Sequence, residues 1–236
     1  KIGVGGYFYG YLVGVDQDDS AAGGGINADP GNNRRGHHIN REGEIIFTGK
    51  TTLDNGIQFG VQVQLEAETC GDQIDESFMW MSGSFGRINL GSENAASYLM
   101  GYGSVAASHW SAGVNSPGSR FHSTGGNAAG FNTTNAQLTS DAEKITYFTP
   151  RMSGFQLGVS YTPERAQDIA SYAGPAGDAD AGDQSEVVEI GANWTGKMGG
   201  TSIGVSGSFG EASEEVSSAT SEDRQEYTLG IKASMS

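Results

Sequence analysis

The feature that most constrains this chain is an alternation of apolar and polar residues with a period of two. In the clearest segment, Ile57, Phe59, Val61, Val63 and Leu65 are apolar, and Gln58, Gln62, Gln64 and Glu66 lie between them. This spacing places the apolar residues on one face of a β-strand and the polar ones on the other. The pattern recurs in segments of about ten residues separated by turns, which is the signature of a transmembrane β-barrel.

We therefore predict an all-β, antiparallel, up-and-down transmembrane barrel built by a single domain, residues 1–236. The ten expected strands are residues 1–15, 38–53, 57–69, 74–85, 87–91, 141–149, 155–163, 185–195, 201–210 and 224–235. Short connections alternate with long ones along the chain. Outer-membrane barrels are built in this way, with short turns at one rim and long loops at the other.

Composition agrees with a barrel and excludes several other classes. The chain has 38 glycines, 36% apolar residues and a net charge of −15. It contains no apolar run long enough for a transmembrane helix, but barrel strands alternate and average out as polar. Without a basic stripe to meet phosphates, nucleic acid is not an expected partner. The expected partners are outer-membrane lipid, lipopolysaccharide and small hydrophilic solutes.

Enzyme motifs are missing, so we expect a passive pore without catalytic residues. None of the four histidines, His37, His38, His109 and His122, lies in a nucleophile elbow or a zinc-binding helix motif. The alternative from another class is a Gly-rich secreted β-solenoid or adhesin that binds a surface. Such a protein would show a short fixed repeat, and the sequence has none.

The segment 92–139 lacks strand alternation and is rich in Gly, Ala, Ser and Asn. It also carries large apolar groups, which favour a packed rather than a solvated loop. We predict that it folds into the barrel and narrows the pore, with its aromatic residues packing against Phe78 and Trp80. The alternative is an external lid over the barrel mouth.

Charged residues on the polar faces are the candidate pore-lining groups. They are Lys50, Arg87, Lys144, Lys232, Glu42, Glu44 and Glu66, with Glu93 and Arg120 on the 92–139 segment. With Glu76, Glu189 and Glu226 added, acidic groups outnumber basic ones on the wall. Since exposed charges are screened at physiological salt, we expect a weak cation preference. Arg87 and Lys144 flank the constriction segment and are the strongest candidates.

Acidic residues also gather in the long connections. Asp178, Asp180 and Asp183 form the most compact group, and carboxylate oxygens are the ligands that calcium prefers. Calcium binding at these acidic loops is one interpretation, and plain solvated loops are the other, because charge runs are usually solvated. No further cofactor is expected.

Three stretches resemble the trimeric general porins of Gram-negative bacteria, especially the purple-bacterial branch. They are Asn55-Gly-Ile-Gln-Phe-Gly60, Met81-Ser-Gly-Ser-Phe-Gly-Arg-Ile-Asn-Leu-Gly91 and Ile145-Thr-Tyr-Phe-Thr-Pro-Arg-Met-Ser-Gly-Phe155. The resemblance implies a sixteen-stranded barrel, a homotrimer, an outer-membrane location and a third extracellular loop folded into the pore. Because Lys1 begins directly with patterned sequence, we expect a mature, processed form. Ten strands enclose too little space for side chains and the 92–139 segment, so compared with the sixteen strands of the family we expect about six C-terminal strands to be missing. The chain departs from the family because its constriction segment carries only one carboxylate, Glu93.

Overall fold

The computed structural model describes residues 1–14, 37–67, 74–103, 106–108, 112–113, 136–165, 183–216 and 223–235. The chain divides into two compact units. The larger unit comprises Lys1–Gly6, Ile45–Tyr102 and Asn135–Ser236, and the smaller one Tyr7–Glu44 and Gly103–Thr134. No helix among the described residues is long and apolar enough to cross a membrane.

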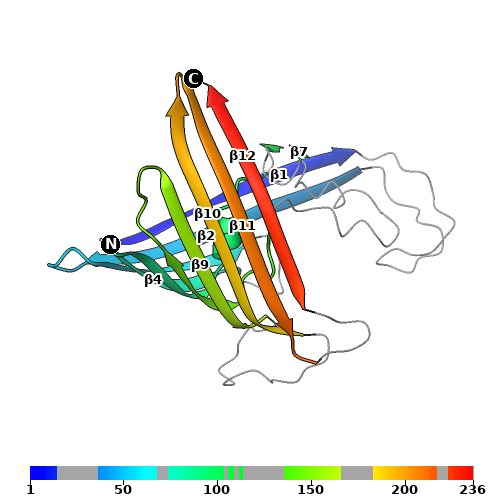
Figure 1. The fold of residues 1–236 in the computed structure, drawn as a ribbon. Helices are drawn as coiled ribbons and strands as arrows, with labels where there is room; N and C mark the ends of the chain where they lie inside the picture. Colours follow the sequence, from blue (N-terminus) through cyan, green and yellow to red (C-terminus); the bar gives the residue numbers. More distant parts are fainter. Residues whose placement is uncertain are drawn as a thin grey trace. The chain divides into compact units, whose positions relative to one another are not determined.

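Ten strands form one sheet in the order β1-β2-β3-β4-β5-β8-β9-β10-β11-β12 (Figure 1). Their bounds are β1 Ile2–Gly14, β2 His37–Thr52, β3 Gln58–Glu66, β4 Ser77–Gly83, β5 Gly86–Ser92, β8 Glu143–Phe148, β9 Phe155–Glu164, β10 Gln184–Met198, β11 Thr201–Glu214 and β12 Arg224–Met235. A helical turn, α1 (Ala96–Leu99), and a small pair, β6 (Ala106–Ser108) with β7 (Ala112–Gly113), lie between β5 and β8. From β3 to β12 every neighbouring pair is antiparallel, which confirms the predicted fold class.

The short connections form because the sequence supplies turn chemistry there. Between β2 and β3, the Asn55 side-chain oxygen accepts a hydrogen bond from the Ile57 amide at 3.1 Å. Gly56 has a φ of +83°, a conformation that glycine adopts without steric cost. Its amide donates to the Leu53 carbonyl at 2.9 Å, so the short connection between the strands predicted at 38–53 and 57–69 is a tight turn.

One register line across the sheet consists of apolar and aromatic residues only. We call it the outer row: Phe59, Met81, Ile88, Tyr147, Val159, Ile190, Phe209 and Tyr227 pair in sequence from β3 to β12. None of these side chains is buried, and Phe59, for example, is 40% exposed. Apolar residues on an uncovered sheet face are the opposite of what a soluble sheet shows.

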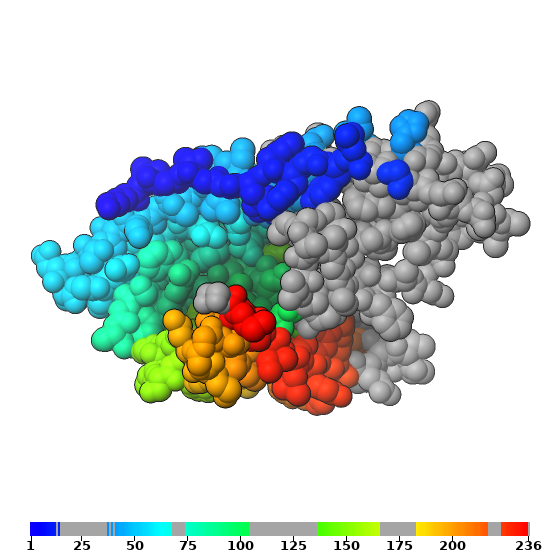
Figure 2. Space-filling view, turned by 90° about the horizontal axis from the view of Figure 1, so that it is seen from above, coloured from blue at the N-terminus to red at the C-terminus, as the bar shows by residue number. Residues whose placement is uncertain are grey.

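The register line one residue away is mostly polar or small. This inner row comprises Gly60, Trp80, Asn89, Thr146, Ser160, Glu189, Gly210 and Glu226. Asn89, Thr146, Ser160 and Glu189 are each at most 2% exposed. β9 to β12 lie side by side in the space-filling view (lime to red in Figure 2). On β5, β8, β9 and β10 the polar side chains of the inner row are therefore buried, whereas the apolar side chains of the outer row are not.

Candidate functional site

The polar face of the sheet, which we call the inner face, is where the ends of the β5–β8 connection lie. The connection reaches β9 first through the Ala96 amide, which donates to the Ser160 hydroxyl oxygen at 2.8 Å. The Ser160 and Thr146 hydroxyls share a further hydrogen bond at 2.7 Å. On β10, a Cβ at Gly191 would lie 2.3 Å from the Ala96 carbonyl oxygen, so the backbone of α1 rests where the wall has no side chain.

The chain then continues over β10, β11 and β12. The Asn193 side-chain amide donates to the Met100 carbonyl at 3.1 Å, and the Tyr102 amide donates to the Ser206 hydroxyl at 2.8 Å. The Lys232 ammonium lies 3.9 Å from the centre of the Tyr102 ring, within the range of a cation–π contact. Three strands therefore hold the outgoing end through polar groups of the inner face.

The returning end of the connection meets the same wall. The Leu138 amide and the Thr139 hydroxyl donate to the Glu189 carboxylate at 3.2 and 2.5 Å. The Gln137 amide donates to Glu226 at 3.0 Å, and the Arg165 guanidinium donates to the Leu138 carbonyl at 2.8 Å. Both described ends of the connection are thus fixed to the inner face.

These contacts differ from the anchoring predicted at Phe78 and Trp80. Tyr102 lies against Lys232 and over Gly204, where an added Cβ would be 2.7 Å from its ring. Trp80 instead covers Gly60 and has the Arg87 guanidinium 4.8 Å from its ring. Trp110, Phe121 and Phe131 lie outside the described residues, so the inward course of the whole 92–139 segment stays a prediction.

Lys144 lies on the inner face, as the alternation along its strand predicts, but residues of the β5–β8 connection cover it. Its side chain is 3% exposed. The ammonium donates to the backbone carbonyls of Glu93, Ser140 (2.8 Å) and Ala142. A buried ammonium needs its three donors satisfied, and these carbonyls supply the acceptors. In the described structure Lys144 therefore ties the two ends of the connection together and is not an open wall charge.

Glu93 and Arg87 meet through Asn89. The Asn89 amide donates to both Glu93 carboxylate oxygens at 2.8 and 2.6 Å, and Arg87 Nε donates to Asn89 Oδ1 at 2.6 Å. Glu93 follows β5 directly and is 6% exposed. Desolvation raises the pKa of the Glu93 carboxyl to about 7, while the Asn89 hydrogen bonds act in the opposite direction.

A second carboxylate near the start of the connection was not predicted to be buried. Glu76, just before β4, accepts hydrogen bonds from Gln64 and from Asn94 (2.8 Å). Burial raises the pKa of its carboxyl, and the hydrogen bond from Asn94 lowers it in part. The alternation of residues along a strand predicts which face of the sheet Glu76 lies on. It does not predict which other segment of the chain covers that face.

The other candidate residues are placed as follows. Lys50 and Lys232 are exposed, and Glu66 is half-buried. In the smaller unit, Glu42 is buried and Glu44 accepts a hydrogen bond from the Tyr7 hydroxyl at 2.5 Å. Arg120, Asp178 and Asp180 lie outside the described residues, and the half-buried Asp183 accepts the Glu215 amide through its backbone carbonyl. The pore-lining and calcium assignments therefore stay predictions.

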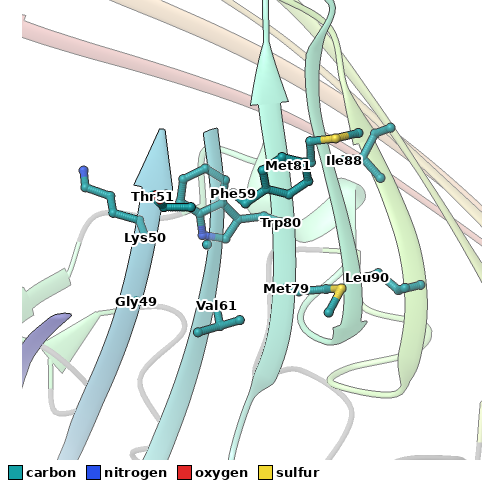
Figure 3. Close-up of a pocket in the computed structure, with 11 residues that line it drawn as sticks. Gly49, Lys50, Thr51, Phe59, Val61, Met79, Trp80, Met81, Ile88 and Leu90 are labelled. Atoms are coloured by element: carbon teal, nitrogen blue, oxygen red, sulfur yellow. The ribbon is translucent and has the colours of Figure 1, made fainter. Parts of the chain in front are cut away.

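The outer face carries an apolar groove of about 490 Å³ over β2 to β5 (Figure 3). Two cross-strand rows line it: Phe59–Met81–Ile88 and Val61–Met79–Leu90. Gly49 on β2 leaves room beside Val61, because a Cβ there would lie 3.2 Å from a Val61 methyl. The groove has the character of a surface that meets lipid or protein rather than water.

A family model described as Gram-negative porin matches residues 2–236. The chain belongs to the Gram-negative porin family. Its location is accordingly the outer membrane. No curated protein matches the chain.

Among solved structures, the anion-selective porin from Comamonas acidovorans is similar with a TM-score of 0.48 and 18% identity, over 97% of this chain and 63% of that one. A mutant of the Rh. blastica porin is similar with a TM-score of 0.47 and 17% identity, over 100% of this chain and 81% of that one. The chain thus spans less than two thirds of the length of the Comamonas porin.

Proposed function

We propose that the complete porin forms a water-filled pore for passive diffusion of small hydrophilic solutes and ions, and performs no catalysis. The observation that carries this proposal is the contrast between the outer row and the inner row. An apolar outer face can meet hydrocarbon, and a polar inner face keeps hydrogen-bonding partners that hydrocarbon lacks. A channel wall needs both faces in this arrangement.

The 92–139 segment is proposed to narrow this pore. Support comes from its two described ends, which lie on the inner face and bind β9 to β12 through side chains of the wall. The segment therefore leaves the wall and returns to it on the inner side of the sheet. The narrowest part of a pore dominates its conductance and selectivity.

The outer face is proposed to divide between lipid and a neighbouring protomer of a homotrimer. The groove over β2 to β5 supports this, because its two apolar rows offer a hollow that a protomer surface can fill. Lipid and lipopolysaccharide would meet the remaining outer face.

Charge selection is proposed to be a weak preference for cations. The net charge of −15 supports the sign. Four of the charged residues predicted to line the wall, Lys144, Glu42, Glu76 and Glu189, are buried. The electrostatic field of the wall is therefore weaker than the number of charged residues on the polar faces suggests. Exposed charges more than about 8 Å apart are screened at physiological salt.

Planar-bilayer recording of the full-length protein, purified in detergent, tests the proposal. We expect discrete conductance steps without added substrate, and uptake of small neutral sugars by liposomes that contain the protein. Liposomes that stay impermeable, combined with specific binding of the protein to a cell surface, would instead favour the adhesin alternative.

A further inference from the structure

The Glu189 carboxylate contacts both ends of the β5–β8 connection at once. One oxygen, Oε1, accepts the Ser97 hydroxyl at 2.7 Å and the Leu138 amide at 3.2 Å. The other, Oε2, accepts the Thr139 hydroxyl at 2.5 Å. Ser97 belongs to the outgoing end and Leu138 and Thr139 to the returning end. A single side chain therefore joins Ser97 and Leu138, which have 40 residues between them in the sequence (98–137).

This carboxylate is buried and accepts three hydrogen bonds. Its side chain is 1% exposed, and Ser97 and Thr139 are also buried. A buried carboxylate is costly without hydrogen bonds, and three donors converge on this one. The backbone carbonyl of Ala136 accepts a weaker bond from the Ser97 hydroxyl at 3.4 Å, so Ser97 also connects the two ends directly.

Glycines on the wall allow the ends to approach the carboxylate closely. At Gly191, which lies two residues after Glu189 on β10, a Cβ would be 2.3 Å from the Ala96 carbonyl oxygen. At Gly210, which pairs with Glu189 on β11, a Cβ would lie 2.7 Å from the Leu138 side chain. The wall is therefore shaped for both ends at the position of this carboxylate.

We propose that Glu189 is the positioning residue of the constriction: its carboxylate clamps both ends of the β5–β8 connection to the inner face and so holds the width of the pore steady. This inference rests on the proposed pore function. Glu189 acts through hydrogen bonds to the connection, and its charge is not needed to meet permeating ions because it is buried. The clamp binds two ends, whereas Glu226 accepts the returning end alone, through Gln137.

The decisive experiment compares Glu189→Ala, Glu189→Gln and the matched control Glu211→Ala, which removes an exposed carboxylate from the neighbouring strand β11. All are studied in single-channel recordings of the full-length protein. Glu189→Ala removes the acceptor of three hydrogen bonds. Its current should drop to substates at least about tenfold more often, because the loss of a single hydrogen bond to a carboxylate already corresponds to about that factor. Glutamine keeps an oxygen for Ser97 and Leu138 and offers an N–H to the Thr139 oxygen. Glu189→Gln should therefore stay close to the wild type. Glu211→Ala should do so as well, because the Glu211 carboxylate accepts its hydrogen bond from Gln225 on β12 and not from the connection.

The outcomes separate cleanly. Steady current in Glu189→Ala, or equal noise in all three variants, would overturn the clamp. Equal changes of ion selectivity in Glu189→Ala and Glu189→Gln, with steady current in both, would show action through charge and also overturn it. If Glu189→Ala does not assemble, the double variant Ser97→Ala/Thr139→Ala decides: frequent substates support the clamp and quiet channels refute it. A wild type that does not conduct at all contradicts the pore function itself.

Discussion

The outer row and the inner row are one residue apart on every strand, yet they differ in almost every property. Phe209 and Gly210 show the contrast on β11: the phenyl ring of Phe209 is exposed, and the Gly210 position is buried against Leu138. On β10, Ile190 is exposed and the adjacent Glu189 is covered. The difference indicates that the outer face of this sheet suits an apolar environment. The inner face suits a polar occupant, which in the described residues is the ends of the β5–β8 connection.

The largest expected effect comes from placing a charge on the outer face. Val61→Arg should reduce the free energy of unfolding by about 2–4 kcal/mol if Val61 lies near mid-membrane. The matched control is Gln62→Arg, one residue away on the inner face, where an added cation should mainly change selectivity. Urea unfolding of the full-length protein in lipid vesicles measures both. Equal losses from the two variants would contradict the assignment of faces.

Filling the space at Gly191 should have the next largest effect. Gly191→Ala places a methyl group where the Ala96 carbonyl lies, and overpacking of this kind costs about 1–3 kcal/mol. Gly207→Ala on the outer face is the control, because its Cβ would meet Leu229 at an ordinary 3.4 Å. We expect a raised conductance or frequent substates only for Gly191→Ala. If Gly207→Ala perturbs the channel as much, close approach of α1 to the wall is not the cause.

The strands could be predicted from the sequence because period-two alternation is local. All ten predicted strands are present, and the turn at Asn55-Gly56 is where its residue types place it. The boundaries were less exact, since β10 and β11 run on to Met198 and Glu214. The extensions are Gly196-Lys-Met198 and Glu211-Ala-Ser-Glu214. Gly, Lys, Ala and Glu are depleted in strands, so these residues carry little strand signal.

The contacts of the candidate site were beyond sequence reasoning. The period-two alternation placed Lys144 and Glu189 on the inner face. It could not show that the β5–β8 connection covers them. The partners of Glu189 are serine, threonine and a backbone amide, at sequence separations of 50 residues or more. Such small polar residues are common everywhere in this chain, so nothing marks the ones that bind the wall.

A smaller effect is expected from pH through Glu93. Burial raises its pKa from 4.5 to about 7, so in the folded protein the carboxyl loses its proton only near neutral pH. Its contribution to stability is complete below pH 4.5, declines between pH 4.5 and 7, and stays low above that. On acidification from pH 8 to 6, the folded protein therefore loses one negative charge near the constriction.

Reversal potentials at pH 8 and pH 6 measure this loss as a modest decrease in cation preference. Glu93→Gln is the control that isolates the carboxyl. The variant should show a smaller difference between the two pH values than the wild type. An unchanged difference would assign the whole pH effect to other groups.

The smallest effect concerns salt and the Arg87 guanidinium. We expect the cation preference of the full-length channel to be weak at 0.1 M salt and to fade at 1 M, because the screening length falls from about 10 Å to about 3 Å. Arg87 is half-buried, bound to Asn89 and held over Trp80, so its charge stays fixed on the inner face. Arg87→Ala removes that cation and should strengthen the cation preference at low salt, with Arg87→Lys as the charge-conserving control. Firm anion selectivity of the wild type at low salt would show that the negative total charge of the chain does not set the field in the pore.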